Sequence, residues 1–196
     1  MINQQQMKVN LYLQEYDKLK AEQTARIGFR DNLLYVTLTL FGAIVSYAIS
    51  KESYLVLIVV PWVCLIMGWT YLVNDEKISA IGCYIRLALT NKLAEELGIT
   101  NKIEIDALFG WEIAHRDDNR RKRRKIEQLI IDEITFVVAG ISALVGFCLF
   151  STTSSSILTV LFWSELGLLI ILGIEIAVYA DLKKGADDDH LVQPHR

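Results

Sequence analysis

The sequence has little proline, cysteine or histidine: 2 prolines, 3 cysteines and 3 histidines among 196 residues. The cysteines (Cys64, Cys83 and Cys148) are odd in number and no two of them have C-x-x-C spacing, so neither a disulfide framework nor a zinc site is predicted. The histidines form no ligand cluster, and we expect no metal and no other cofactor. The hydrophobic share of 53% excludes a disordered chain.

Catalytic signatures are also missing. The chain has no glycine-rich phosphate loop, no H-E-x-x-H metalloprotease motif and no G-x-S-x-G nucleophile elbow. The letters H-R-D at 115–117 match one piece of the protein-kinase signature, but nothing else of that signature is present. The sequence therefore predicts no enzyme and no catalytic residue.

What the sequence does have is four apolar runs, each close to the roughly 20 residues that cross a bilayer as a helix. The first two runs, 32–50 and 54–73, contain no charged residue. The third, 129–150, carries acids only near its start, and the fourth, 157–180, carries two glutamates. These runs predict an all-α membrane protein with four transmembrane helices.

Basic residues give the predicted topology. Of the 20 Lys and Arg residues, Lys51 alone lies between the first two spans, and none lies in the serine-rich turn at 151–156. All the others lie before the first span, between the second and third spans, or after the fourth. Because cytoplasmic loops carry the excess of Lys and Arg, both termini and the middle segment are predicted to be cytoplasmic.

The spans divide the chain into five predicted segments. These are a cytoplasmic N-terminal helix at 1–31, a transmembrane hairpin at 32–74, an all-helical cytoplasmic segment at 75–128, a second hairpin at 129–180 and a cytoplasmic tail at 181–196. The N-terminal helix is expected to run directly into the first span. Asn74 or Asp75 is expected to cap a new helix, whose apolar face extends from Ile78 to Leu97. Gly98 is its expected end.

Three further expectations concern local structure and assembly. Pro61 removes a backbone donor and is expected to kink the second span. Another cytoplasmic helix is expected to begin near 109–111 and to lead into the third span. The cytoplasmic helices of one chain offer little core, and their repetition around a symmetry axis would bury them better, which favours a homo-oligomer.

The sharpest polar feature is a run of six cations, preceded one turn earlier by Arg116. The run consists of Arg120, Arg121, Lys122, Arg123, Arg124 and Lys125. One interpretation is a topology signal that also contacts anionic lipid headgroups, where each cation gains about 1 kcal/mol. The other is a binding surface for a phosphate-rich ligand such as a nucleotide or an oligonucleotide, because guanidinium groups bind phosphates in pairs.

Two glutamates of the fourth apolar run are candidate pore residues. Glu165 lies near mid-membrane depth, and Glu175 lies ten residues further on, close to the inner surface. A charge at such depth is costly and usually faces a partner or water. Glu165 is therefore either a protonated acid hydrogen-bonded to a neighbouring helix or, with Glu175, part of an acidic ring that lines a cation pore. Asp132 and Glu133 are expected to be interfacial partners of the basic run.

Three segments resemble a known set of proteins. They are EYDKLKAEQTARIGFRDNLLY at 15–35, GWTYLVNDEKISAIGCYIR at 68–86 and FGWEIAHRDDNRRKRRK at 109–125. These segments resemble small bacterial four-span membrane effectors of anti-phage defence operons, most of all the channel component of Hailong-type systems. The resemblance covers about the first two thirds of the chain. It implies a homo-oligomeric channel, with a tetramer favoured, in the bacterial inner membrane. It also implies a nucleotidyltransferase partner, encoded nearby, whose oligonucleotide product controls the channel.

Together these features predict an ion channel that is controlled by an anionic nucleotide or oligonucleotide on the cytoplasmic side and depolarises the membrane as an anti-phage effector. In this interpretation Arg116 and the basic run bind the ligand, and Glu165 and Glu175 line the pore. One alternative is a non-conducting membrane anchor or scaffold that recruits a cytosolic enzyme. Another is a small proton-coupled transporter with Glu165 as the coupling site.

Overall fold

The computed structural model describes residues 4–112, 120–151 and 155–180. Every element in these ranges is a helix, and no strand occurs among them. In chain order they are α1 (Gln4–Ser50), η1 (Tyr54–Ile58), α2 (Val59–Tyr84), η2 (Ile85–Leu89), α3 (Thr90–Leu97), α4 (Lys102–Leu108), α6 (Arg121–Asp132), η3 (Glu133–Val138), α7 (Ala139–Phe150) and α8 (Ser156–Tyr179). Four of the helical stretches are long and apolar enough to cross a membrane, which confirms the all-helical prediction and its four candidate spans.

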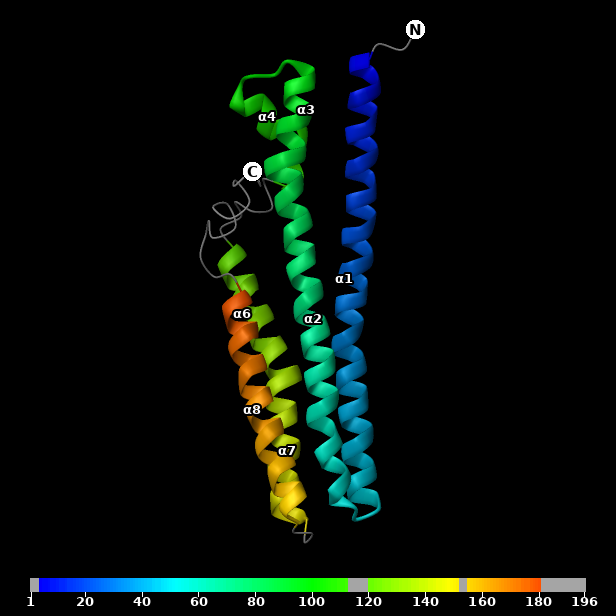
Figure 1. Cartoon of the computed structure of the whole chain (residues 1–196), viewed down its shortest axis with the longest axis vertical. Coiled ribbons are helices and arrows are strands. Elements are labelled where there is room, and N and C mark those ends of the chain that lie inside the picture. The colour runs from blue at the N-terminus through cyan, green and yellow to red at the C-terminus, as the bar shows by residue number, and fades with distance from the viewer. Residues whose placement is uncertain (1–3, 113–119, 152–154, 181–196) are drawn as a thin grey trace. The chain divides into compact units, whose positions relative to one another are not determined.

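The two longest helical stretches contain the first and second apolar runs. Helix α1 is a single helix of 47 residues, drawn as an unbroken ribbon from blue to cyan in Figure 1, and it runs directly into the first apolar run as predicted. Helix α2 passes through Asn74 without a break and continues through η2 and α3 to Leu97. The predicted new helix start at Asn74 or Asp75 is therefore wrong. The reason is local: Asn74 Nδ2 donates to the Thr70 carbonyl at 2.8 Å, inside the helix, instead of capping a new one.

Helix ends follow simple local chemistry. Gly98 has a φ of 69°, and the following N–H of Ile99 bonds the Ala94 carbonyl at 2.9 Å, so the predicted end at Gly98 is confirmed. Pro61 lies in the first turn of α2, directly after the 3₁₀ turn η1. The first N–H groups of a helix have no partner within it, so Pro61 marks a helix start rather than the predicted kink. Helix α4, which the sequence did not predict, is capped by Asn101.

The described chain divides into two compact units. One, which we call the polar unit, draws its described residues from Met1–Gly28 and Asp75–Arg123. The other, the span unit, draws them from Phe29–Asn74 and Arg124–Asp181. Helices α1, α2 and α6 each contribute residues to both units.

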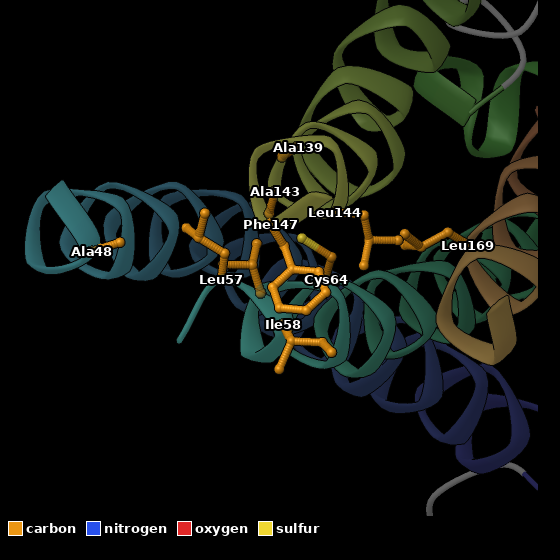
Figure 2. Close-up of a cluster of buried hydrophobic side chains, with 10 residues drawn as sticks. Ala48, Leu57, Ile58, Cys64, Ala139, Ala143, Leu144, Phe147 and Leu169 are labelled. Atoms are coloured by element: carbon orange, nitrogen blue, oxygen red, sulfur yellow. The ribbon is translucent and has the colours of Figure 1, made fainter. Parts of the chain in front are cut away.

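The span unit has a close-packed apolar core. Figure 2 shows its first cluster, in which Leu144 of α7 and Leu169 of α8 point toward one another. Glycines allow this close approach: a Cβ added at Gly140 would lie 2.8 Å from the Leu169 side chain. A second cluster contains Leu33, Tyr71, Leu72, Phe136, Val137, Leu172 and Ile176. There a Cβ added at Gly68 would lie 2.8 Å from Leu172 and 3.0 Å from the Phe136 ring.

The polar unit is held by side-chain contacts of α1 instead. Lys8 Nζ lies 2.6 Å from Glu96 Oε1, and Lys20 Nζ lies 2.7 Å from Glu112 Oε1. Tyr84 donates its hydroxyl hydrogen to Glu15 at 2.7 Å, which joins α1 to α2 between those two ion pairs. Val9, Tyr12, Tyr16 and Leu19 are half-buried on the same stretch of α1, so these polar contacts add to a partly apolar face.

Candidate functional site

The basic run lies on the same continuous helix as the third apolar run. Helix α6 starts within the basic run, and helical structure continues from Arg123 through η3 and α7 to Phe150. Arg120, Arg123 and Arg124 are exposed, and Lys125 is half-buried. Arg121 and Lys122 are described by their helical backbone alone, and Arg116 lies outside the described residues. Part of the basic run and the third apolar run thus belong to one helical stretch.

The helix points its described cations in different directions. Each residue turns the chain by about 100°, so the consecutive side chains of Arg123, Arg124 and Lys125 do not share one face. Because α6 opens with five cations, it places positive charge at the helix end where the backbone dipole already favours anions. The described cations thus add positive charge on more than one side of the first turns of α6.

The chain just before the run is held against α1 within the polar unit. The ring of Phe109 stacks on Tyr16 with a centroid distance of 4.3 Å and an interplanar angle of 12°. The Glu112 side chain, only 10% exposed, pairs with Lys20. These two contacts hold residues 109–112 against α1.

The chain just after the run is held by a second polar group, which we call the Tyr71 cluster (Arg30, Tyr71, Gln128 and Asp132), within the span unit. Gln128 Nε2 donates to the Tyr71 hydroxyl at 3.2 Å, and the Arg30 guanidinium lies 5.7 Å from the centre of the Tyr71 ring. Asp132 is 4% exposed and interacts with the Tyr71 hydroxyl. The cluster thus joins α1, α2 and α6.

The Tyr71 cluster was not predicted, and it changes the interpretation of two acids. Asp132, expected at the interface as a partner of the basic run, is buried beside Tyr71 instead. Glu133 is half-buried, and its Oε2 would lie 3.2 Å from a Cβ added at Gly173, so it faces α8. The signal in the sequence was the spacing of Gln128 and Asp132, which one helical turn places on a common face.

Two π-helical segments were not predicted either. One is η2, where Thr90 Oγ1 donates back to the Ile85 carbonyl at 2.7 Å. The other is η3, which begins directly after Asp132 and connects α6 to α7. Short π-helical segments inside α-helices frequently occur at functional sites. Segment η3 lies within the third apolar run, directly after the helix that carries the basic run, and is a candidate for such a role.

The two candidate pore acids lie in different surroundings on α8. Glu165 is 0% exposed, and neither of its carboxyl oxygens has a well-aligned hydrogen bond within the described part of the chain. Trp62 on α2 is the polar side chain beside it. Glu175 is half-buried. The structure thus separates one enclosed acid from one partly exposed acid, and the pore roles of both stay predictions.

Neither a metal-ligand group among the described residues nor a known relative identifies the site. Within residues 4–112, 120–151 and 155–180, no group of three or more His, Cys, Asp or Glu side chains could hold a metal ion. Comparisons with protein-family models, with curated proteins and with solved structures find no significant match. The fold defines the class: an all-helical protein with four helical stretches able to cross a membrane.

Proposed function

We propose that the protein is a homo-oligomeric ion channel of the bacterial inner membrane, with both termini cytoplasmic, and that an anionic nucleotide or oligonucleotide on the basic run controls its opening. The distribution of Lys and Arg supports the orientation. Three segments resemble four-span anti-phage effectors: 15–35, 68–86 and 109–125. This resemblance supports a tetramer that depolarises the membrane. It also supports a nucleotidyltransferase partner that makes the ligand.

One observation carries this proposal: the basic run and the third apolar run share one continuous helix, Arg123–Phe150. A polyanion that binds Arg120, Arg123 and Arg124 removes their mutual repulsion and stabilises conformations in which the cations lie closer together. Because a helix transmits displacement along its axis, a ligand that favours those conformations of the basic run also acts on the third span. A ligand changes gating in proportion to its different affinities for the open and closed states.

The proposed pore contains Glu175, whose side chain is half-buried in one chain and whose remaining surface is open to a neighbouring subunit or to water. Glu165 is enclosed within its own chain, so it becomes a pore residue in states that separate α8 from Trp62 on α2.

Replacement of Glu175 by glutamine is expected to lower the preference for cations over anions. An unchanged reversal potential in an ion gradient would remove Glu175 from the pore.

The test is single-channel recording from purified protein in a planar bilayer, with a short single-stranded oligonucleotide added on the side of the basic run. The test variant is R120Q/R123Q/R124Q. The matched control is K18Q/K77Q/K102Q, which removes three exposed cations elsewhere. We expect the wild type and the control to change open probability with the oligonucleotide, while the test variant conducts without responding. Oligonucleotide binding that is equal in both variants would contradict the proposed site.

A second candidate function is a non-conducting anchor for a cytosolic enzyme. Two large apolar side chains of the polar unit favour it, because Ile103 is 78% exposed and Trp111 is 71% exposed. Exposed large apolar groups are typical of protein-protein contacts. Folded, oligomeric protein that never conducts, and that loses a co-purifying enzyme in I103S/W111S, would favour the anchor over the channel.

A further inference from the structure

Glu165 is an acid enclosed in the middle of an apolar helix. It is the tenth residue of the 24-residue helix α8, about 15 Å from the helix start. Its side chain has 0% exposure, and one turn further on lies Leu169, a member of the core cluster in Figure 2. The enclosure is provided by this chain alone, so it depends on neither lipid nor a second subunit.

The surroundings of Glu165 provide no positive charge to balance a carboxylate. The four apolar runs, 32–50, 54–73, 129–150 and 157–180, contain no Lys or Arg. The other acids of the four runs are Asp132 of the Tyr71 cluster, Glu133 of η3, which lies against Gly173, and Glu175 on α8 itself. None of them supplies a positive charge, and each would repel a negative Glu165 when ionised. The other titratable side chains of the four runs are Cys64 and Tyr71 on α2, Cys148 on α7, Tyr35 and Tyr47 on α1, Tyr54 on η1, and Tyr179 on α8. The cations on the span unit's helices, Arg30 on α1 and Arg124 and Lys125 on α6, precede the apolar runs.

Hydrogen bonding does not replace that missing charge. Neither Glu165 Oε1 nor Oε2 has a well-aligned hydrogen-bond donor within the described part of the chain. Trp62 alongside can offer a single N–H, its indole Nε1–H. An ionised carboxylate without counter-charge or donors costs far more in an apolar interior than a neutral carboxylic acid does. The neutral acid needs a single bound proton, which the aqueous phase supplies.

We infer that Glu165 is an intramembrane proton-binding site, which the folded span unit holds as a neutral carboxylic acid at neutral pH. This inference does not rest on the proposed function, since it concerns one closed chain whether or not an oligomer conducts. It assigns the proton as the ligand of Glu165, in preference to a metal cation, because no group of three or more His, Cys, Asp or Glu side chains that could hold a metal ion occurs among the described residues.

The inference predicts a specific chemical modification. An apolar carbodiimide reaches acids inside a bilayer and reacts with them when they are protonated. The acid gives its proton to one carbodiimide nitrogen, and the carboxylate oxygen adds to the central carbon. The acyl group then shifts from oxygen to nitrogen, which leaves a stable N-acylurea. The reaction is an addition that needs no oxidant and releases no leaving group, so the modified peptide gains the mass of one reagent molecule.

The test uses dicyclohexylcarbodiimide on the full-length protein in lipid nanodiscs, with peptide mapping by mass spectrometry. We expect Glu165 to be modified in preference to Glu133 and Glu175, and modification to fall by about tenfold per pH unit above the midpoint of its titration. Glu165 should still be modified in E175Q. Absence of modification at Glu165 would overturn the inference. Protection by sodium or potassium at constant pH would overturn it too, because it would show that the site takes a metal cation.

A second measurement does not depend on access of the reagent. Infrared spectroscopy in deuterated buffer should show the carbonyl stretch of a protonated carboxylic acid in the wild type and its loss in E165Q. Glutamine matches the neutral acid in shape, so E165Q should melt within a few degrees of the wild type. E175Q is the matched control and should retain the carbonyl band. A wild-type spectrum without that band would contradict the neutral acid directly.

Discussion

The polar unit and the span unit use the same helices in opposite ways. In the polar unit, α1 is fastened by polar and aromatic side chains, among them the Lys20–Glu112 pair and the stack of Tyr16 on Phe109. In the span unit, α2, η3 and α8 approach so closely that Gly68 leaves no room for a Cβ. The first kind of contact is directional and responds to salt and pH. The second is close packing and responds to volume.

This difference matters for a protein proposed to transmit a signal along its helices. Partly exposed ion pairs contribute little each and exchange partners readily, which suits the part proposed to sense a ligand. Close-packed interiors do not deform continuously, which suits a part that changes between discrete states. The Tyr71 cluster is the exception within the span unit, because it is polar, largely buried and directly next to η3.

The largest effect is expected from Gly68→Val. Its side chain would collide with Leu172 and with the base of the buried Phe136 ring, which has no room to move. Overpacking of this kind costs about 1–3 kcal/mol of unfolding free energy. The control is Gly167→Val, because nothing lies within 4 Å of a Cβ at Gly167. Unfolding by detergent titration should separate the two variants, and equal stability would contradict the close contact at Gly68.

The next effect is expected from Tyr71→Phe. Removal of the hydroxyl takes away the acceptor of Gln128 and the group that interacts with the buried Asp132. A buried polar group that loses its partner costs about 1–3 kcal/mol. Tyr35→Phe is the matched control, since Tyr35 is 68% exposed. The same detergent titration checks both variants, and a loss no larger than that of the control would show that the hydroxyl does not stabilise the span unit.

A smaller effect is expected from Glu112→Gln in the polar unit. The Lys20 and Glu112 side chains are 30% and 10% exposed, so water and salt screen their attraction in part. We expect Glu112→Gln to lower the stability of the polar unit by about 0.5–1 kcal/mol. Amide hydrogens of α1 around Lys20 should exchange faster, and their exchange rates should depend less on salt than in the wild type. Glu104→Gln, at an exposed position, is the control. Wild-type exchange rates in the Glu112 variant would show that the pair does not fasten α1.

The smallest effect is a pH dependence at the beginning of α1. The hydrogen bond that Lys8 Nζ donates to Glu96, together with the charge of that carboxylate, raises the pKa of Lys8 above its ordinary value of 10.5. The stabilisation is therefore fully present below pH 10.5 and is lost as the pH rises through the raised pKa. Carbon NMR of the Lys8 side chain should show the raised pKa in the wild type and an ordinary value in E96Q. Equal midpoints would contradict the contact.

The long elements could be predicted from the sequence because their signals are local. Apolar runs gave the four candidate spans, and Gly98 ended its helix because glycine adopts a positive φ without strain. Asn74 misled the prediction because its side chain can either cap a new helix or bond back within an existing one, and the choice depends on how the neighbouring turns pack. The same ambiguity affected Pro61, which starts a helix as readily as it bends one.

The surroundings of the polar side chains could be predicted less well. The run of six cations can be read directly from the sequence, but the exposure of Arg123 and Arg124 and the half-burial of Lys125 come from the structure. The enclosure of Glu165 and the meeting of Arg30, Tyr71 and Asp132 depend on contacts between helices far apart in the chain. The spacing of Gln128 and Asp132 places both on one face of a helix, but a single sequence carries no local signal for the partners that this face meets.

The most direct test of the proposed channel is the planar-bilayer recording of wild-type protein with and without oligonucleotide on the side of the basic run. The account predicts discrete single-channel currents whose open probability changes with the oligonucleotide, and loss of that response in R120Q/R123Q/R124Q with the conductance retained. Currents that do not change with the oligonucleotide, or silence from protein shown to be folded and oligomeric, would contradict it.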